Sequence, residues 1–117
     1  MTNERIENIE CAKWLAERLD SIQRGEDDEC ESLADWLCDE ALDITFEANL
    51  HGDVRAFSVL VTVGGPRVSV ELLVSGGSAV WVKSFGVEGV CYPISDFVVD
   101  ELWDSLCDMA SSVTIRA

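Results

Sequence analysis

Basic side chains, paired cysteines and long apolar runs are what this sequence has little of. Its 117 residues include 8 lysines and arginines against 23 aspartates and glutamates, so the formal net charge is −15. A chain with that charge is repelled by nucleic acid and by anionic membranes, and it is attracted to basic proteins. We therefore expect no direct contact with nucleic acid or with a membrane, and we expect a basic protein as the partner.

The absence of long apolar runs bears on location and on domain organisation. No apolar run is long enough to span a bilayer, and the first residues, MTNERIENIE, lack the apolar centre of a signal peptide. We therefore expect a cytoplasmic protein. With 48% apolar residues, four tryptophans and four phenylalanines, the chain has enough material for a core. Residues 1–117 are expected to form a single domain.

Cysteine and histidine are too scattered for a recognisable metal site. No Cys-x-x-Cys spacing occurs, and His51 is the only histidine, whereas zinc sites usually take close ligand pairs. The acidic stretch EDDE at 26–29 lacks the interleaved spacing and the glycine of a calcium loop. We predict no metal and no other cofactor. All five cysteines are predicted to be reduced thiols, as is usual in a reducing compartment: Cys11, Cys30, Cys38, Cys91 and Cys107.

The sequence also lacks a catalytic arrangement. General acid–base and nucleophilic catalysis need a positioned base with a tuned pKa, and His51 lies in a predicted turn. Folding could bring it to Cys38 or Cys91, but no spacing favours either pairing. The glycine pairs at 64–65 and 76–77 lie between predicted strands, so they are not phosphate-binding loops, which join a strand to a helix. We predict that the protein is not an enzyme.

Hydrophobic periodicity predicts helices at both ends of the chain. Apolar residues at steps of three and four predict a helix over residues 3–23 and a second helix that opens with the acidic stretch at 26–31. The predicted buried face of the second helix is Cys30, Leu33, Ala34, Leu37, Cys38 and Ala41. A third helix is predicted at about 95–110, after Pro93 and with Ser95 as its N-cap. Its predicted inward face is Phe97, Val98, Leu102, Leu106, Met109 and Ala110.

Between the helices the hydrophobic period changes to two. Strands are predicted at 44–50, 55–63, 67–75 and 79–85, separated by the turns HGD, GGP and GGS. Short strands with tight turns are typical of an antiparallel meander. The predicted fold is α+β, with two N-terminal helices, a four-stranded antiparallel meander and a C-terminal helix (ααββββα). The tail at 111–117 is predicted to add a short edge strand or to lie on the surface.

The charge is divided between these segments. Residues 1–50 hold 15 acidic and 4 basic side chains, residues 51–93 hold 3 of each, and residues 94–117 hold 5 acidic and 1 basic. The sheet segment is therefore neutral, and nearly all of the negative charge belongs to the helical segments. We expect the acidic side chains to point outward from a helical layer.

Two columns of carboxylates are the candidate binding residues. In the C-terminal helix, aspartates recur every four residues at Asp96, Asp100, Asp104 and Asp108, with Glu101 beside them. Like charges at that spacing repel by roughly 0.2–0.5 kcal/mol per pair. A second predicted column is Glu31, Asp35 and Asp39, preceded by Asp27 and Asp28 at the predicted helix start. An ordinary solvated surface that keeps the protein soluble is the alternative interpretation of both columns.

The spacing of such a column is similar to that of nucleic acid. Four helical residues rise about 6 Å, and phosphates along one DNA strand are separated by about 3.4 Å along the axis and by more along the backbone. A row of short, rigid aspartates can therefore present charge to a basic groove much as a nucleic-acid backbone does. This geometry favours a non-enzymatic inhibitor of nucleic-acid-binding proteins.

The segments GGPRVSV (64–70), Trp81 and YPISDFVVDELWDSL (92–106) resemble small acidic proteins of bacterial mobile elements. Those proteins place a Gly-Gly-Pro turn between strands and end in an acidic helix led by proline. The resemblance covers the C-terminal half and departs at SFGVEGVC (84–91), where a more aromatic strand is expected. It implies an anti-CRISPR or anti-restriction setting, with a Cas effector or a restriction enzyme as the partner.

Two other functions remain open. An immunity protein that blocks a basic nuclease toxin would use the same charge complementarity with a different partner. A small acidic secretion chaperone, acting as a homodimer, would bind an unfolded segment in an apolar groove, so exposed apolar surface would favour it. Three tryptophans are predicted to lie off the core faces of their elements and are candidates for such a surface: Trp36, Trp81 and Trp103.

Overall fold

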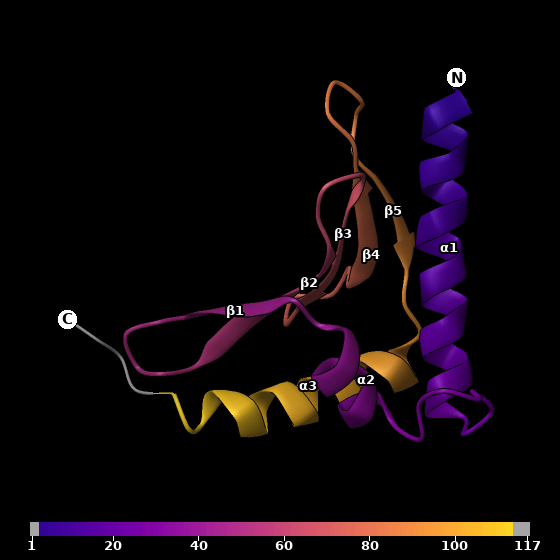
Figure 1. Ribbon diagram of the computed structural model, residues 1–117. Helices are drawn as coiled ribbons and strands as arrows, with labels where there is room; N and C mark the ends of the chain where they lie inside the picture. Colours follow the sequence, from indigo (N-terminus) through magenta and orange to yellow (C-terminus); the bar gives the residue numbers. More distant parts are fainter. Residues whose placement is uncertain (1–2, 114–117) are drawn as a thin grey trace.

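The computed structural model describes residues 3–113 of the chain (Figure 1). The elements follow the order α1 (Asn3–Gln23), α2 (Leu33–Glu40), β1 (Asp43–Ala48), β2 (Val54–Thr62), β3 (Arg67–Leu73), β4 (Ala79–Lys83), β5 (Val90–Pro93) and α3 (Asp96–Ala110). Residues 114–117 of the predicted tail segment lie outside the described residues. Residues 111–113 form a turn that ends α3.

The sheet has five antiparallel strands in the order β1-β2-β3-β4-β5. The fold has α+β character, but the prediction of a four-stranded meander is wrong because it missed β5. This strand has only four residues, and it ends at Pro93, which reads in sequence as the entry to a helix. Proline cannot donate a ladder hydrogen bond and is tolerated on an edge strand. The fifth strand is therefore held by its pairing with β4 rather than by a strong local pattern.

One face of the sheet forms the core. Directly opposed residues on paired strands share a face, and the register places Phe57 opposite Leu72, and Val70 opposite both Val59 and Val80. All five of these side chains are buried. The alternation of period two that predicted β2, β3 and β4 therefore corresponds to burial on this face.

The helices cover that face from two directions (Figure 1). The long helix α1 packs along β4 and β5, and α3 lies under the β1–β2 hairpin and contacts β2. The short α2 packs against α3 and α1 where these two helices approach each other. From residue 12 onward the predicted apolar series of α1 is buried at Ala12, Ala16, Leu19 and Ile22, and Leu15 is buried beside it. Ile6, an earlier member of that series, is 42% exposed.

Helix α2 begins later than predicted and buries a different face. Ser32 caps it by accepting a hydrogen bond from the Asp35 amide at 3.1 Å, so residues 26–31 precede the helix. Trp36 is fully buried, whereas the predicted core residues Ala34 and Cys38 are exposed. Burying an indole removes far more apolar area from water than burying Ala or Cys. The helix therefore turns Trp36 and its apolar neighbours toward the core. The prediction that Trp36 lies off the core is wrong.

Helix α3 has the predicted bounds within one residue, but its N-cap and inward face differ in detail. Ser95 occupies the N-cap position, yet its side chain makes no capping hydrogen bond and donates to the Asp20 carboxylate of α1 at 2.6 Å. Val98, Leu102 and Leu106 are buried, as predicted. Phe97 was predicted to face inward and is 75% exposed, because it lies one residue before the buried position that the i, i+4 series selects.

Candidate functional site

The acidic column of α3 lies on the surface along the whole helix. Asp96, Asp100, Asp104 and Asp108 are all exposed, and so is Glu101. At 3.6 residues per turn, each fourth residue advances by about 40° around the axis, so the four aspartates follow one gently slanting line. The buried residues of α3 hold the opposite side of the helix against the core. The prediction that these aspartates lie along one exposed face of a helix is therefore confirmed.

The carboxylates of α3 differ from several N-terminal acids in making no ion pair among the described residues. Within residues 3–113, every ion pair joins a basic side chain of α1, or Arg24 just after it, to an acid of α1 or of the segment 24–32, to Glu40 or to Glu88. None of these pairs involves an acid of α3. The column is therefore exposed and makes no ion pair within the described residues, so its charge can attract an external cation.

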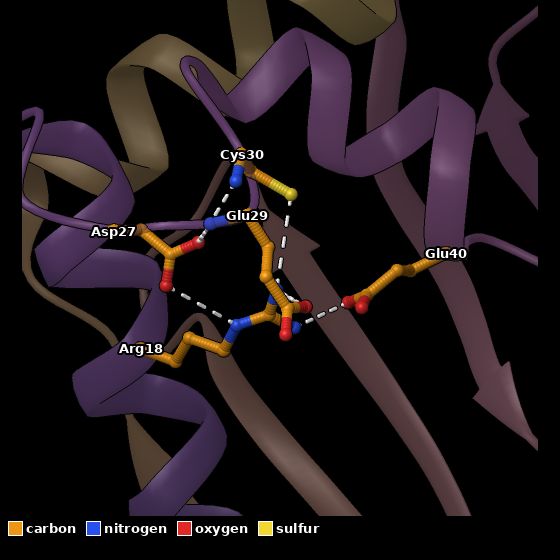
Figure 2. A network of polar contacts seen from close by, with 5 residues as sticks. All are labelled: Arg18, Asp27, Glu29, Cys30 and Glu40. Atoms are coloured by element: carbon orange, nitrogen blue, oxygen red, sulfur yellow. Dashed lines mark hydrogen bonds and ion pairs between the residues drawn. The ribbon is translucent and has the colours of Figure 1, made fainter.

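The N-terminal acids that sequence reasoning grouped with the column are partly engaged inside the protein. Arg18 of α1 is only 13% exposed and contacts three carboxylates (Figure 2). Its Nε lies 3.5 Å from Asp27, and its two terminal nitrogens lie 3.4 Å from Glu29 and 2.6 Å from Glu40. This Arg18 network fastens the loop after α1 and the end of α2 to α1.

Asp27 shapes the loop before α2 rather than opening a helix. Its Oδ2 accepts hydrogen bonds from the amides of Glu29 and Cys30, at 3.0 Å and 2.9 Å. The Cys30 amide is the main cause that lowers the pKa of Asp27, and the Glu29 amide and Arg18 add to it against a smaller opposing effect of burial. Burial alone would lower the pKa of Arg18, but Glu40 and Asp27 outweigh it and raise that pKa. The carboxylate of Asp27 is therefore occupied within the fold.

The other predicted residues of the second column are exposed but do not form one helical line. Asp35 and Asp39 lie on α2. Glu31 precedes the N-cap, so it is not in helical register with them, and Asp28 lies further back in the loop. This second acidic region is therefore less regular than the column of α3.

A groove beside the column was not predicted from the sequence. It has a volume of about 450 Å³ and is lined by Leu73, Val74, Val99, Asp100, Trp103 and Asp104. Trp103 is half-buried, and its ring meets Phe57 edge-on with centroids 4.9 Å apart. The end of β3 and one side of α3 form the walls, so no local sequence pattern could have revealed the groove.

Two tryptophans are exposed outside the groove. Trp14 of α1 is 61% exposed, and the centroid of its ring lies 5.9 Å from the guanidinium carbon of Arg18. Trp81, predicted to lie off the core, is 42% exposed on the sheet face that α1, α2 and α3 leave uncovered. On that face Arg67 and Lys83 are directly opposed on β3 and β4. The alternation of Trp81 with buried Val80 and Val82 was the signal that placed it there.

The five cysteines are free thiols in different surroundings. Cys30 is buried, and burial is the main cause that raises its pKa. Burial also raises the pKa of Cys11 and of Cys107, and Asp104 and Asp108 raise that of Cys107 further. His51 lies in the β1–β2 turn, at the opposite edge of the sheet from Cys91 on β5, so the fold does not assemble those two residues.

Comparisons with known proteins do not assign the chain to a family. No family model, curated protein or solved structure matches the chain. Within residues 3–113, no three or more His, Cys, Asp or Glu side chains are grouped so that they could hold a metal ion, and no helix is long and apolar enough to cross a membrane. The candidate functional features are therefore the acidic column of α3 and the groove beside it.

Proposed function

We propose that the protein is a non-enzymatic inhibitor that binds a basic nucleic-acid-binding protein of a bacterial defence system, in the cytoplasm. The partner class is a Cas effector or a restriction enzyme, as the sequence resemblance to small acidic proteins of mobile elements suggests. The observation that carries the proposal is the exposed column Asp96, Asp100, Asp104 and Asp108, none of which has an ion pair among the described residues.

The physical basis is competition for a surface that normally holds phosphates. A protein that binds nucleic acid neutralises phosphates with Lys and Arg and releases counterions. A rigid row of carboxylates with a rise of about 6 Å per step offers that surface an alternative anion. Glu101 widens the row, and the exposed acids Asp28, Glu31, Asp35 and Asp39 add to the long-range attraction. Asp27 contributes less because its carboxylate already binds Arg18 and two backbone amides.

A displacement assay tests the proposal. A restriction endonuclease and an RNA-guided nuclease complex are each loaded with a fluorescent DNA duplex, and the release of the duplex is followed as the protein is added. We expect release at low salt and weaker release at high salt, because charge-complementary encounter is screened by ions. Failure to displace the duplex from any enzyme of either class at low salt would refute the proposal.

Paired substitutions separate the column from the overall charge. Asp100→Asn with Asp104→Asn removes two charges from the middle of the column, and Glu7→Gln with Glu10→Gln removes two from exposed positions of α1. Exposed charge pairs contribute about 0.2–1 kcal/mol each, so the first variant should bind about 2- to 30-fold more weakly. The second should bind nearly as the wild type does. If the two variants weaken binding equally, the column is an ordinary solvated surface and not the binding site.

A second candidate function is favoured by the exposed apolar side chains. Leu73, Val74 and Trp81 are 41%, 59% and 42% exposed. Exposed apolar surface of this kind is what a secretion chaperone would use to hold an unfolded segment, with homodimerisation as a further expectation of that class. If the protein binds a reduced, unfolded protein with an affinity that does not change with salt, the chaperone function is favoured. Protection against a basic nuclease toxin would instead favour the immunity protein.

A further inference from the structure

The groove between β3 and α3 joins an apolar wall to the middle of the acidic column. Leu73 ends β3 and Val74 lies in the turn that follows it, whereas Val99 and Trp103 come from α3. Asp100 and Asp104 complete the lining, so the two central carboxylates of the column are also the polar rim of the groove. Imitation of phosphates needs only the carboxylates, so it does not account for the apolar wall beside them.

The floor of the groove is held in place from beneath. The Trp103 ring packs edge-on against Phe57, which is 2% exposed, so the indole is supported by the core. Leu73 and Val74, by contrast, expose 41% and 59% of their surface. The groove therefore combines a fixed aromatic floor, an exposed aliphatic wall and two exposed carboxylates. Such a combination can take up apolar side chains and cations at the same time.

We propose that the groove binds a short extended segment of the partner in which basic and apolar residues alternate. The basic residues would face Asp100 and Asp104, and the apolar residues between them would face Leu73 and Val74. This inference deepens the function proposed above, on which it rests for the class of partner. It adds a sequence requirement for the bound segment, which charge mimicry alone does not impose.

The dimensions favour an extended segment over a helix. In a strand, residues i and i+2 point to the same side at a separation of about 6.6 Å. Asp100 and Asp104 are separated by a helical rise of about 6 Å, so two basic residues with one residue between them match the two carboxylates. A helix is about 10–12 Å across with its side chains, so about one turn or less would fill the available 450 Å³.

Charge disfavours a second copy of the chain as the occupant of the groove. Two carboxylates and no basic side chain of the described residues line the groove, and a second copy would approach with its own net charge of −15. Bringing two such surfaces together is opposed by repulsion at low salt. A basic segment gains from the same field, so charge complementarity selects it.

Two synthetic peptides of identical composition provide the test. The alternating peptide is Gly-Lys-Leu-Lys-Val-Lys-Gly, and the block peptide is Gly-Lys-Lys-Lys-Leu-Val-Gly, both with blocked ends. We expect the alternating peptide to bind about tenfold more tightly by calorimetry, because only it can place its apolar side chains and its cations in the groove together. Equal affinity of the two peptides would overturn the inference.

Matched substitutions locate the binding to the groove. Val74→Thr alters the apolar wall, and Val63→Thr makes the same change at a position of similar exposure, 61% against 59%, in the β2–β3 turn region. We expect Val74→Thr to abolish most of the preference for the alternating peptide and Val63→Thr to leave it unchanged. A preference that survives Val74→Thr would also overturn the inference.

The same peptides distinguish failure of this inference from failure of the proposed function. Asp100→Asn with Asp104→Asn should weaken both peptides, because both carry the same cations. If the two peptides bind equally while nucleases still lose their duplex, the acidic column acts by charge alone and the groove proposal is wrong. If the alternating peptide is preferred while no nuclease is displaced, the groove proposal holds and the inhibitor function is wrong.

Discussion

Replacing Arg18 by methionine is the most direct test of how the protein manages its negative charge. Methionine keeps much of the aliphatic stem but removes the guanidinium that contacts Asp27, Glu29 and Glu40 (Figure 2). Three carboxylates are then left near one another without their cation. We expect a marked loss of stability without a change of fold, because the apolar core does not depend on this side chain.

The magnitude follows mainly from the contact with Glu40. That contact is a charge-assisted hydrogen bond of 2.6 Å between side chains that are 13% and 32% exposed, and bonds of this class contribute about 1.5–3 kcal/mol. Glu29 is 80% exposed, so its pair with Arg18 contributes little. The Trp14 ring, at 5.9 Å, adds about 0.5 kcal/mol at an exposed site. Arg18→Met should therefore lower the free energy of unfolding by about 2–3 kcal/mol.

Urea unfolding followed by circular dichroism measures this change, with Arg24→Met as the control. Arg24 is 53% exposed and pairs with Glu26 at 3.2 Å, so its removal should cost less than about 0.5 kcal/mol. Both variants lower the net charge by one, so any general effect of charge cancels between them. If Arg18→Met is no less stable than Arg24→Met, or if a double-mutant cycle with Glu40→Gln shows no coupling, the Arg18 network does not stabilise the fold.

Three further outcomes are expected. The pKa of Asp27 is lowered in the folded state. The stability that ionised Asp27 contributes is therefore complete above its unfolded pKa of about 3.9 and is lost as the pH falls through the folded pKa. The stability difference between wild type and Asp27→Asn, measured by urea titrations at several pH values, should shrink over that pH range. Native alkylation followed by mass spectrometry should label exposed Cys38 quickly and buried Cys30 only after unfolding, because burial hinders access and raises the Cys30 pKa; rapid labelling of Cys30 in the native protein would contradict this. Since Asp104 raises the pKa of Cys107, Asp104→Asn should speed alkylation of that thiol near neutral pH, and an unchanged rate would show that the field of α3 is weaker than argued.

The features that the sequence determined by itself are those carried by local periodicity. The steps of three and four in residues 12–22 specify the buried stripe of α1, and the alternation around Val80 and Val82 specifies which side of β4 enters the core. The i+4 spacing of Asp100 and Asp104 places them together on any helix, whatever the rest of the chain does. For these residues the repeat of the backbone alone decides which side chains share a face.

The tertiary structure decided everything that depends on pairing between distant segments. Strand β5 forms by pairing with β4, and Trp36 is buried where α2 packs against α1 and α3. Arg18 meets Glu40 across 22 residues of chain. The groove joins the end of β3 to α3 in the same way. The free energy of such contacts depends on which surfaces folding brings together, and a local repeat carries no information about that choice.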